Sequence, residues 1–495
     1  MNIQKWQLPL QTSTLIISFM VWVLISSLIP NIRLDIPLTD GQVALVTAVP
    51  VILGSLLRIP LGIWTTRFGA RAMFIICFIA LLFPVFFLSV ANSYSDLIIG
   101  GLFLGIAGAT FSIGVTSLPK YYPKERHGFI NGIYGVGNIG TAITAFSAPI
   151  VAKQIGWTTT IQLYLILLLV FVVLNFLIGD RKESRVKTSL VEQVKGVYKN
   201  EKLWFLSFFY FITFGAFVAF TVYLPNFLVK NFELDPVDAG FRTAGFIALT
   251  TFVRPLGGWL SDKYNPFVIL MFVFGGLTLS GVLLSFSPTI GLYTIGCLTI
   301  AFCSGIGNGT VFKLVPLYFS KQAGVVNGIV AAMGGLGGFF PPLVLTFVFN
   351  ITGHYAIGFM ALSEFALASL VMVLWVYYQE KLSLASKIIE STAEGMMVTD
   401  TNGVIQNINP AFSKVTGYKP DEIIGQTPSI LQSGRHDKDF YHKMWETIHK
   451  EGSWKGEIWN KRKNGEIYRE WLTISEIKNE AGDVKNYVGL FSELK

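Results

Sequence analysis

Charged residues are scarce in this chain. Asp, Glu, Lys and Arg make up only 14% of its 495 residues, whereas hydrophobic residues make up 52% and the mean hydropathy is +0.56. Because a soluble domain carries about 25% charged residues, this composition indicates an integral membrane protein. The shortage ends near Tyr378, beyond which charged residues become frequent. This change predicts a second, soluble domain.

Cysteine and processing signals are also sparse. Cys77, Cys297 and Cys303 lie inside apolar segments without the spacing of metal ligands, so we expect them to pack in the core. No small-residue cleavage site follows the apolar stretch 15–29, which is therefore predicted to be a first transmembrane helix. The net charge of +8 comes largely from short loops between apolar stretches, which indicates membrane orientation rather than a nucleic-acid partner.

Long apolar stretches dominate the first part of the chain. A spanning helix needs about 20 such residues, and this length predicts about twelve spans in two groups of six. The predicted spans are 12–30, 43–65, 72–91, 96–119, 127–151, 159–179, 203–229, 240–261, 266–287, 290–318, 324–350 and 355–378. We therefore expect an all-α membrane domain over 1–380, with halves at about 12–179 and 203–378, a central loop at 180–202, and a separate domain at 381–495.

Alternate loops differ in their positive charge. One set holds most of the Lys and Arg residues, among them Arg67, Arg71 and Lys263, whereas the other set holds few. The positive-inside rule makes the basic set cytoplasmic. The interpretation is a multi-pass protein of the cell membrane with both termini and the soluble domain in the cytoplasm.

Two arginines occupy matching places in the halves. "RIPLGIWTTRFGAR" begins at Arg58 in the second span, and "RPLGGWLSDKY" begins at Arg254 in the eighth. Such duplication is typical of transporters built from parallel repeats, whose substrate site lies between the halves near the bilayer midplane. An Arg at that depth costs roughly 2.5 to 3.5 kcal/mol on insertion scales, so it needs a partner.

Carboxylates that could neutralise these arginines are nearly absent from the spans. Glu364 in the last span is essentially the only one, and it cannot pair with both arginines. Snorkelling does not explain Arg58 either, because it lies about ten residues, or roughly 15 Å, from the loop residue Arg67. The guanidinium fork matches trigonal oxyanions, so Arg58 and Arg254 are predicted to clamp a small planar anion.

Glycines gather in the fifth and eleventh spans. The segments read "GIYGVGNIGTAITAF" and "NGIVAAMGGLGGFFPP", and spacings of this kind let helices approach each other and a ligand closely. We call seven glycines of these two segments the signature glycines: Gly132, Gly135, Gly137, Gly140, Gly334, Gly337 and Gly338. Packing without function produces such seams in many membrane proteins, but their presence in equivalent spans favours a functional role.

With these motifs the chain resembles the nitrate/nitrite porter family of the major facilitator superfamily. "GIYGVGNIG" is similar to that family's nitrate signature, and "GIGNGTVFKLVP" in the tenth span also resembles the family. The resemblance implies two six-helix bundles with nitrate and nitrite as substrates. Beside the arginines, it implies a site lined by Asn138, Tyr210, Phe111, Phe214 and Phe312.

The resemblance also concerns the gating loops. Where the superfamily has an Asp in these loops, Thr66 stands in the first half and Asp262 in the second. The gating-loop residues are then Arg67, Arg71, Asp262 and Lys263.

These features predict a transporter rather than an enzyme, without a cofactor for transport. An anion between two arginines removes their repulsion, so the loaded halves should close more easily than the empty ones. This favours nitrate/nitrite antiport by alternating access. Glu364 and water routes leave proton-coupled nitrate uptake open, and a nitrate receptor that signals through the C-terminal domain is a further alternative.

The C-terminal segment resembles a PAS sensory domain over about 385–495. Alternating strands surround short helices, with turns at Asn402-Gly403 and Asn464-Gly465. The residues that carry the resemblance are Asp400, Gly403, Asn409, Phe412, Gly417, Tyr418, Trp454, Gly456 and 460–465. PAS domains bind ligands, haem or flavin, or pair with each other, so PAS-mediated self-association is one expectation. The segment lacks the Cys of photoactive flavin domains; FAD is the first candidate cofactor, and haem bound by His442 or His449 is the second.

Overall fold

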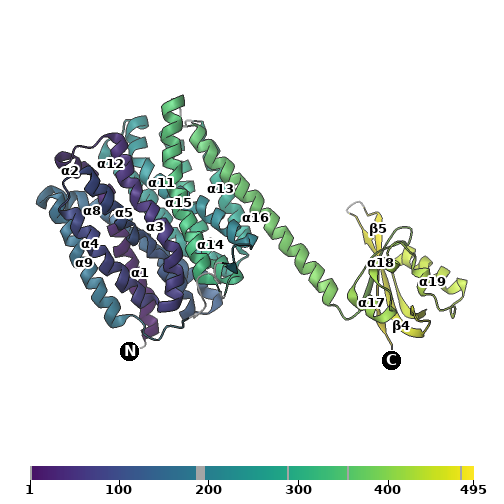
Figure 1. The fold of residues 1–495 in the computed structure, drawn as a ribbon. Coiled ribbons are helices and arrows are strands. Elements are labelled where there is room, and N and C mark those ends of the chain that lie inside the picture. The colour runs from purple at the N-terminus through teal and green to yellow at the C-terminus, as the bar shows by residue number, and fades with distance from the viewer. Residues whose placement is uncertain are drawn as a thin grey trace. The chain divides into compact units, whose positions relative to one another are not determined.

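The computed structural model describes residues 3–185, 195–286, 289–320, 322–353, 356–479 and 482–494. The chain forms two compact units, Met1–Leu374 and Trp375–Lys495, and each is described by itself. The first unit is a helical bundle, and the second is built around a β-sheet (Figure 1). Part of the predicted central loop, 186–194, lies outside the described residues.

Helices of the first half make up the N-terminal part of the bundle. The first, fourth and fifth predicted spans are each assembled from shorter helical segments. These elements are α1 (Ile3–Trp22), α2 (Leu24–Asp35), α3 (Asp40–Phe68), α4 (Ala70–Ser89), α5 (Tyr94–Ala109), α6 (Phe111–Ser117), η1 (Leu118–Tyr121), η2 (Lys124–Arg126), α7 (His127–Gly135), η3 (Val136–Asn138), α8 (Ile139–Ile155) and α9 (Trp157–Ile178).

The second half consists of long continuous helices. They are α11 (Glu201–Phe232), α12 (Pro236–Lys263), α13 (Pro266–Ser285), α14 (Ile290–Tyr318), α15 (Ala323–Thr352) and α16 (Ala356–Ser391). Ten helices among the described residues are long and apolar enough to cross a membrane. The eighth and eleventh predicted spans are also helices, α12 with 28 and α15 with 30 residues. Arg242 and Arg254 lower the hydropathy of α12.

Tight turns join several helices. Gly69 between α3 and α4 and Gly156 between α8 and α9 have φ values of 86° and 82°, which favour glycine. At the start of α3, Thr39 and Gln42 form a reciprocal capping box, and Ser93 and Asp96 form another at α5. The helix ends are therefore fixed by local sequence, whereas burial of apolar faces assembles the bundle.

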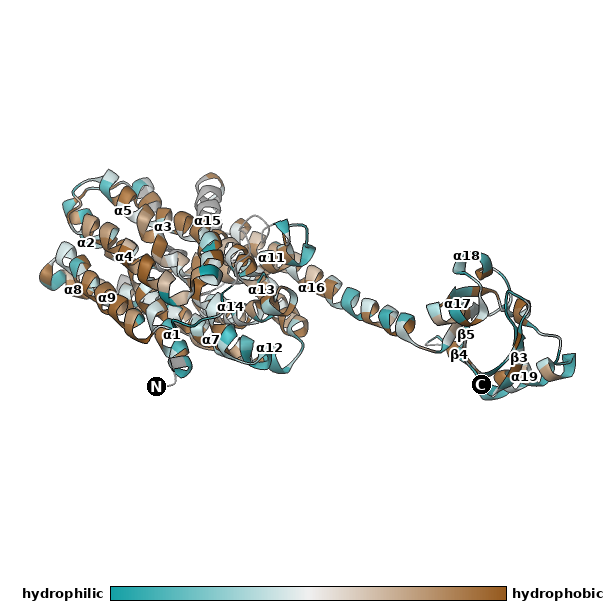
Figure 2. Ribbon diagram, turned by 60° about the horizontal axis from the view of Figure 1, so that its bottom comes forward, coloured by the Kyte–Doolittle hydropathy of each residue, from teal (hydrophilic) through white to brown (hydrophobic). Residues whose placement is uncertain are grey.

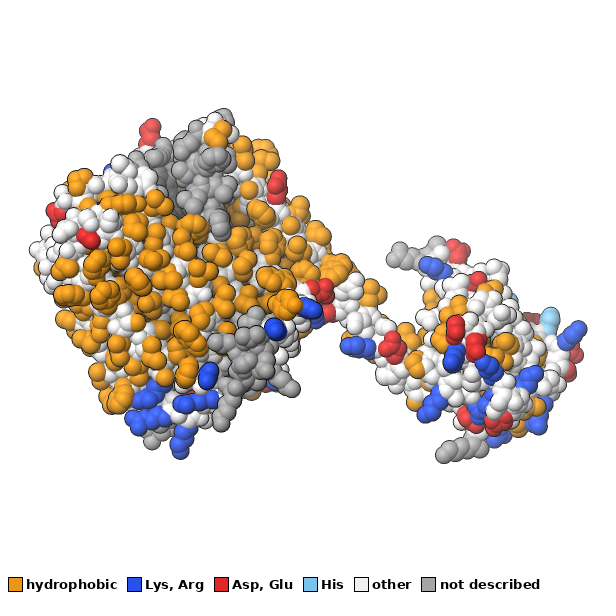
Figure 3. Space-filling view, viewed as in Figure 1, with side chains coloured by type: hydrophobic (Ala, Val, Ile, Leu, Met, Phe, Trp, Pro, Cys, Tyr) orange, Lys and Arg blue, Asp and Glu red, His pale blue; other side chains and the backbone are white. Residues whose placement is uncertain are grey.

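The surface of the first unit is divided by chemistry. A broad apolar face covers its middle, and Lys and Arg side chains gather at one end (Figure 3); the ribbon of this unit is mostly hydrophobic along its helices (Figure 2). We call this end the basic end; it holds the loops that contain Arg67, Arg71, Lys120, Lys124 and Lys263. An apolar band of this kind suits contact with lipid.

The second unit contains a five-stranded antiparallel sheet of order β2-β1-β5-β4-β3. Its elements are β1 (Gly395–Asp400), β2 (Ile405–Ile408), α17 (Pro410–Thr416), α18 (Pro420–Ile423), η4 (Pro428–Leu431), α19 (Lys438–Glu451), β3 (Ser453–Lys461), β4 (Ile467–Lys478) and β5 (Val484–Glu493). Phe412, Leu431, Ile458 and Phe491 are buried in its core. The Asn409 side chain accepts a hydrogen bond from the backbone amide of Phe412 and so caps α17.

Candidate functional site

Both intramembrane arginines are buried at the interface of the two halves. Arg58 on α3 and Arg254 on α12 are each 1% exposed. Among the described residues neither guanidinium forms a salt bridge with a carboxylate. Two buried cations without carboxylates make this interface a strongly electropositive site.

Backbone carbonyls hold Arg58. Its Nε donates to the carbonyl of Gly108 on α5 at 3.2 Å, and its Nη1 donates to the carbonyl of Ala331 on α15 at 2.6 Å. Gly108 belongs to the first half and Ala331 to the second. The Arg58 side chain therefore links the halves without losing its positive charge.

Arg254 has fewer partners. Its Nη2 donates to the hydroxyl of Tyr210 on α11 at 3.1 Å. Its Nε and Nη1 have no hydrogen-bond partner among the described residues. Since unsatisfied buried donors are costly, Arg254 has donors available for an acceptor that enters the site.

Aromatic rings lie beside the two guanidiniums. The ring centroid of Phe111 is 5.7 Å from the Arg58 Cζ and 5.0 Å from the Arg254 Cζ, and that of Phe214 is 5.4 Å from the Arg58 Cζ. Tyr210 stacks on Phe214 at 5.0 Å, and Phe312 meets both Tyr210 and Phe111 edge to face. The structure thus brings the four predicted aromatic residues together around the arginines. They exclude water and strengthen electrostatic interactions there.

Asn138 is buried at the end of η3, a segment that packs against α12. Its side-chain Oδ1 has no hydrogen-bond partner among the described residues. Asn308 on α14 is likewise buried with a free Oδ1, although the sequence did not single it out. The signal for Asn308 was present in the "GIGNG" segment, where an amide interrupts an apolar span.

The signature glycines allow close approach of helices. A side chain on Gly135 would overlap Arg254, and one on Gly132 would meet the backbone of Pro255. Gly334 lies against the Tyr210 ring in the same way. Gly337 faces the Phe211 carbonyl. Several of these glycines therefore let α7 and α15 come close to the site residues.

The remaining signature glycines pack elsewhere. Gly137 and Gly140 face Leu15 and Ile16 on α1, inside the first half, and Gly338 faces Val218 on α11. Gly335 was not predicted, but a side chain added there would overlap Ser55 and come within 3.3 Å of the Arg58 Nη1, which places this glycine beside the site. Helical spacing alone did not reveal which glycine of the run faces the arginine.

Asp262 joins the two halves at the basic end. Its carboxylate accepts hydrogen bonds from the backbone amides of Gly128 at 3.0 Å and Phe129 at 2.7 Å, both in the first turn of α7. It also accepts a hydrogen bond from the Lys313 Nζ at 2.6 Å. Lys313 also donates to the carbonyl of Lys124 at 2.7 Å. A carboxylate at a helix N-terminus is favourable, so this cluster, the Asp262 latch, holds α7 and α12 together.

The other predicted gating residues do not cross between the halves in the described contacts. Arg71 donates to the carbonyl of Phe176 on α9, and Arg67 and Lys263 lie over nearby aromatic rings of their own segments. Thr66, which replaces the family's Asp, packs against Gly324 on α15. Among the described residues, the seam between α3 and α15 is therefore closed by packing and not by a carboxylate.

Two asparagines form matching hydrogen bonds between the halves. Asn131 on α7 donates to the carbonyl of Phe312 on α14 at 3.3 Å. Asn327 on α15 donates to the carbonyl of Val115 on α6 at 3.0 Å. Both side chains are buried, and each lies three residues after a glycine of a seam: Asn131 follows Gly128, which bonds Asp262, and Asn327 follows Gly324, which faces Thr66. This pair was not predicted, although each Asn precedes a glycine in its span.

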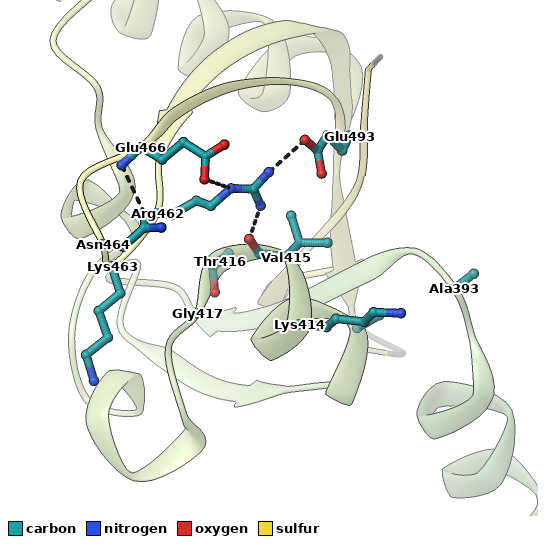
Figure 4. Close-up of a pocket in the computed structure, with 11 residues that line it drawn as sticks. Ala393, Lys414, Val415, Thr416, Gly417, Arg462, Lys463, Asn464, Glu466 and Glu493 are labelled. Carbon is teal, nitrogen blue, oxygen red and sulfur yellow. Dashed lines mark hydrogen bonds and ion pairs between the residues drawn. The ribbon is translucent and has the colours of Figure 1, made fainter.

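The second unit has a separate, polar pocket of about 820 Å³ (Figure 4). Arg462 points into it and pairs with Glu493 at 2.6 Å and Glu466 at 3.2 Å, and it also donates to the Val415 carbonyl. The lining contains Lys414 and other polar residues but no aromatic ring. Apart from Ala393, Ala411 and Val415 the lining is polar, so this pocket offers no ring on which a flavin or a haem could stack.

Buried polar groups occur inside the sheet of the second unit. Glu470 is 1% exposed and accepts from the Asn460 side chain at 2.8 Å. Burial raises the pKa of the Glu470 carboxyl to about 7. His442 and His449 are both exposed on α19, so neither is placed in the domain core where a haem would be enclosed.

Comparison with known proteins agrees with this architecture. The Major Facilitator Superfamily profile matches residues 12–342, and a PAS domain profile matches residues 393–494. The structure of the human organic anion transporter MFSD10 resembles the chain with a TM-score of 0.63 at 12% identity, over 75% of this chain and 99% of that one. This likeness confirms the predicted fold class.

Curated relatives match the membrane domain over nearly their whole length. The nitrite extrusion protein of Bacillus subtilis is 70% identical over 381 residues, which cover 77% of this chain and 96% of the relative. The probable nitrate transporter NarT of Staphylococcus epidermidis is 52% identical over 383 residues, which cover 77% and 99%. These relatives are transporters rather than enzymes, as the sequence predicted for this chain. The chain therefore belongs to the nitrate/nitrite porter family of the major facilitator superfamily, and its C-terminal part is a PAS domain.

Proposed function

We propose that this chain exchanges nitrate and nitrite across the cell membrane by alternating access. The observation that carries the proposal is the pair of buried arginines, Arg58 and Arg254, without a carboxylate partner among the described residues. A small planar anion supplies the missing negative charge and accepts hydrogen bonds from both guanidiniums. The names of the relatives from Bacillus subtilis and Staphylococcus epidermidis support nitrate and nitrite as the anions.

The proposed clamp uses the two arginines differently. Arg254 provides Nε and Nη1, which have no other acceptor in the described part of the chain. Arg58 supplies charge from the opposite side while its carbonyl partners fix its position. Phe111, Phe214 and Phe312 exclude water, and Asn138 and Tyr210 provide further polar contacts.

Exchange is favoured over proton coupling by the position of Glu364. This carboxylate, the candidate proton carrier of the spans, is exposed on the outer surface of α16 rather than buried between the halves. Without an anion, closure of the halves brings two cations together in a low dielectric, which is unfavourable. The empty protein then changes sides slowly, and transport of one anion depends on the return of another.

Exchange can be tested with the purified full-length chain in liposomes. Vesicles loaded with nitrite should take up labelled nitrate at least about tenfold faster than vesicles loaded with an impermeant anion. Chloride and formate should compete poorly if the site selects planar nitrogen oxyanions. Equal uptake into both kinds of vesicle, together with a dependence on a pH gradient, would instead support proton-coupled uptake.

We also propose that the PAS domain regulates this transport from the cytoplasmic side. The basic loops favour a cytoplasmic location of the basic end and of both termini, and we place the domain boundary at 380/381, within α16. PAS-mediated self-association belongs to the same proposal.

Truncation of the chain tests this regulation. A chain truncated after Gln379 should keep basal flux and lose regulation, whereas loss of all flux with retained nitrate binding would favour a receptor. An absorbance spectrum of the purified chain tests for flavin or haem.

A further inference from the structure

The helix α16 carries a residue that does not suit a lipid-facing surface. Glu364 is exposed, and it has no hydrogen-bond or salt-bridge partner among the described residues. It lies eight positions after Ala356, the start of α16, or about 12 Å by helical rise. This depth is inside an apolar layer of about 30 Å. A carboxylate there is costly and needs a polar partner.

The residues around Glu364 follow a heptad pattern. Ile357, Ala361, Glu364, Ala368 and Val371 recur at alternating spacings of four and three, and none of them is buried. This a/d spacing places them on one stripe of the helix and is typical of paired helices. Two alanines flank the carboxylate, and small residues at such positions let two helices approach closely in a membrane.

The same spacing continues in sequence beyond the predicted span. Trp375, Tyr378, Leu382, Ala385 and Ile389 keep the alternation of three and four without a break. Charged residues return in this part of α16, yet Leu382 is 66% exposed and Ile389 37%. Figure 2 shows apolar and polar residues interspersed along this part of α16. An apolar stripe that faces water also indicates a covering partner.

We propose that α16 pairs with α16 of a second copy of this chain. All copies in one membrane share the same orientation, so a two-fold axis along the membrane normal makes the two helices parallel and in register. Each a or d residue then meets its own counterpart, and the repeat is self-complementary. Glu364 meets Glu364, and one protonated and one ionised carboxyl share a hydrogen bond. A single polar residue at such a position also fixes the register.

Cysteine cross-linking of the full-length chain in liposomes tests the water-facing part. In a background with Cys77, Cys297 and Cys303 replaced by Ala, Leu382→Cys and Ala385→Cys should form disulfide-linked dimers, because a disulfide requires Cα atoms less than about 7 Å apart. Ser383→Cys and Lys387→Cys, which lie off the stripe, should cross-link at least about tenfold more slowly. Equal rates at all four positions, or no dimer at any, would overturn the proposal.

A second measurement tests the carboxylate within the membrane. Single-molecule photobleaching of the labelled full-length chain, at decreasing protein-to-lipid ratios, counts the copies in each particle. Glu364→Leu should lower the dimer fraction severalfold, whereas Glu364→Gln, which can still form hydrogen bonds, should largely preserve it. Leu370→Met, which lies six residues after Glu364 and therefore on another side of α16, is the control. An unchanged dimer fraction in Glu364→Leu would contradict the role given to this residue.

Discussion

The two halves of the membrane domain carry the same arginine at matching places but satisfy it differently. Arg58 is held by the carbonyls of Gly108 and Ala331, one from each half. Arg254 is held by the Tyr210 hydroxyl and retains two nitrogen atoms without acceptors among the described residues. A repeated sequence therefore does not imply a repeated role: in the proposed clamp, Arg58 also contributes to closure, and Arg254 offers the two nitrogen atoms that have no other described acceptor.

The seams between the halves show the same asymmetry. The Asp262 latch joins α12 to the first turn of α7 through charge-assisted hydrogen bonds. In the matching seam between α3 and α15, Thr66 and Gly62 pack against Gly324, and no carboxylate of the described residues takes part. One seam thus depends on electrostatics and the other on close packing of small residues.

Substitution of either arginine by lysine should have the largest effect. Lysine keeps the charge but loses the planar fork, and loss of charge-assisted hydrogen bonds of about 3 kcal/mol corresponds to roughly 100-fold in binding. We expect Arg254→Lys to lose nitrate affinity, and Arg58→Lys to lose both affinity and closure. Nitrate/nitrite exchange in liposomes measures both. Arg242→Lys, on the exposed part of α12, is the control, and near-normal exchange in either site variant would disprove the clamp.

The Asp262 latch should be more sensitive to substitution than its counterpart at Thr66. Asp262→Asn removes the charge that faces Lys313 and the α7 N-terminus. We expect the rate of nitrate/nitrite exchange across the membrane to fall roughly tenfold. Hydrogen exchange at the amides of Gly128 and Phe129 should accelerate at the same time. Thr66→Asp should instead slow opening of the other seam, because its carboxylate would face the start of α15. Unchanged protection of the α7 amides in Asp262→Asn would show that the latch is not formed.

Removal of the Tyr210 hydroxyl should have a smaller effect on the site. Tyr210→Phe keeps the ring that stacks on Phe214 but removes the only hydrogen bond described for Arg254. A bond to a charged group is worth about 1.5 to 3 kcal/mol, so the KM for nitrate should rise roughly tenfold. Tyr134→Phe is the control, because the Tyr134 hydroxyl contacts the backbone at Thr110 and Gly114. A larger rise in the KM for nitrate in Tyr134→Phe than in Tyr210→Phe would show that Tyr210 does not provide the important polar contact.

The sequence predicted the site residues whose chemistry conflicts with their surroundings. An arginine in an apolar stretch is visible without any structure, and so is the absence of carboxylates that could neutralise it. The acceptors at Gly108 and Ala331 were not predictable, because every residue has a carbonyl and only the packing of helices selects one. Gly335 was missed for a similar reason, since a run of glycines does not reveal its register. Glu364 was recognised as a carboxylate in a span, but whether it faced the other half or the outer surface depended on how α16 packs.

The smallest expected effects concern Asn131 and Asn327, which form equivalent hydrogen bonds in the two seams between the halves. Asn131→Ala and Asn327→Ala each remove a neutral hydrogen bond between the halves, worth about 1 kcal/mol, or about fivefold in the ratio of closed to open states at the basic end. Spin labels on the two halves report this ratio in the absence of substrate. Asn175→Ala is the matched control, because Asn175 is also buried but bonds Thr14 within the first half. If both asparagines close the basic end, the two variants shift the ratio equally and the double variant shifts it by the product. A shift in Asn175→Ala of the same size would attribute the effect to general loosening of the bundle.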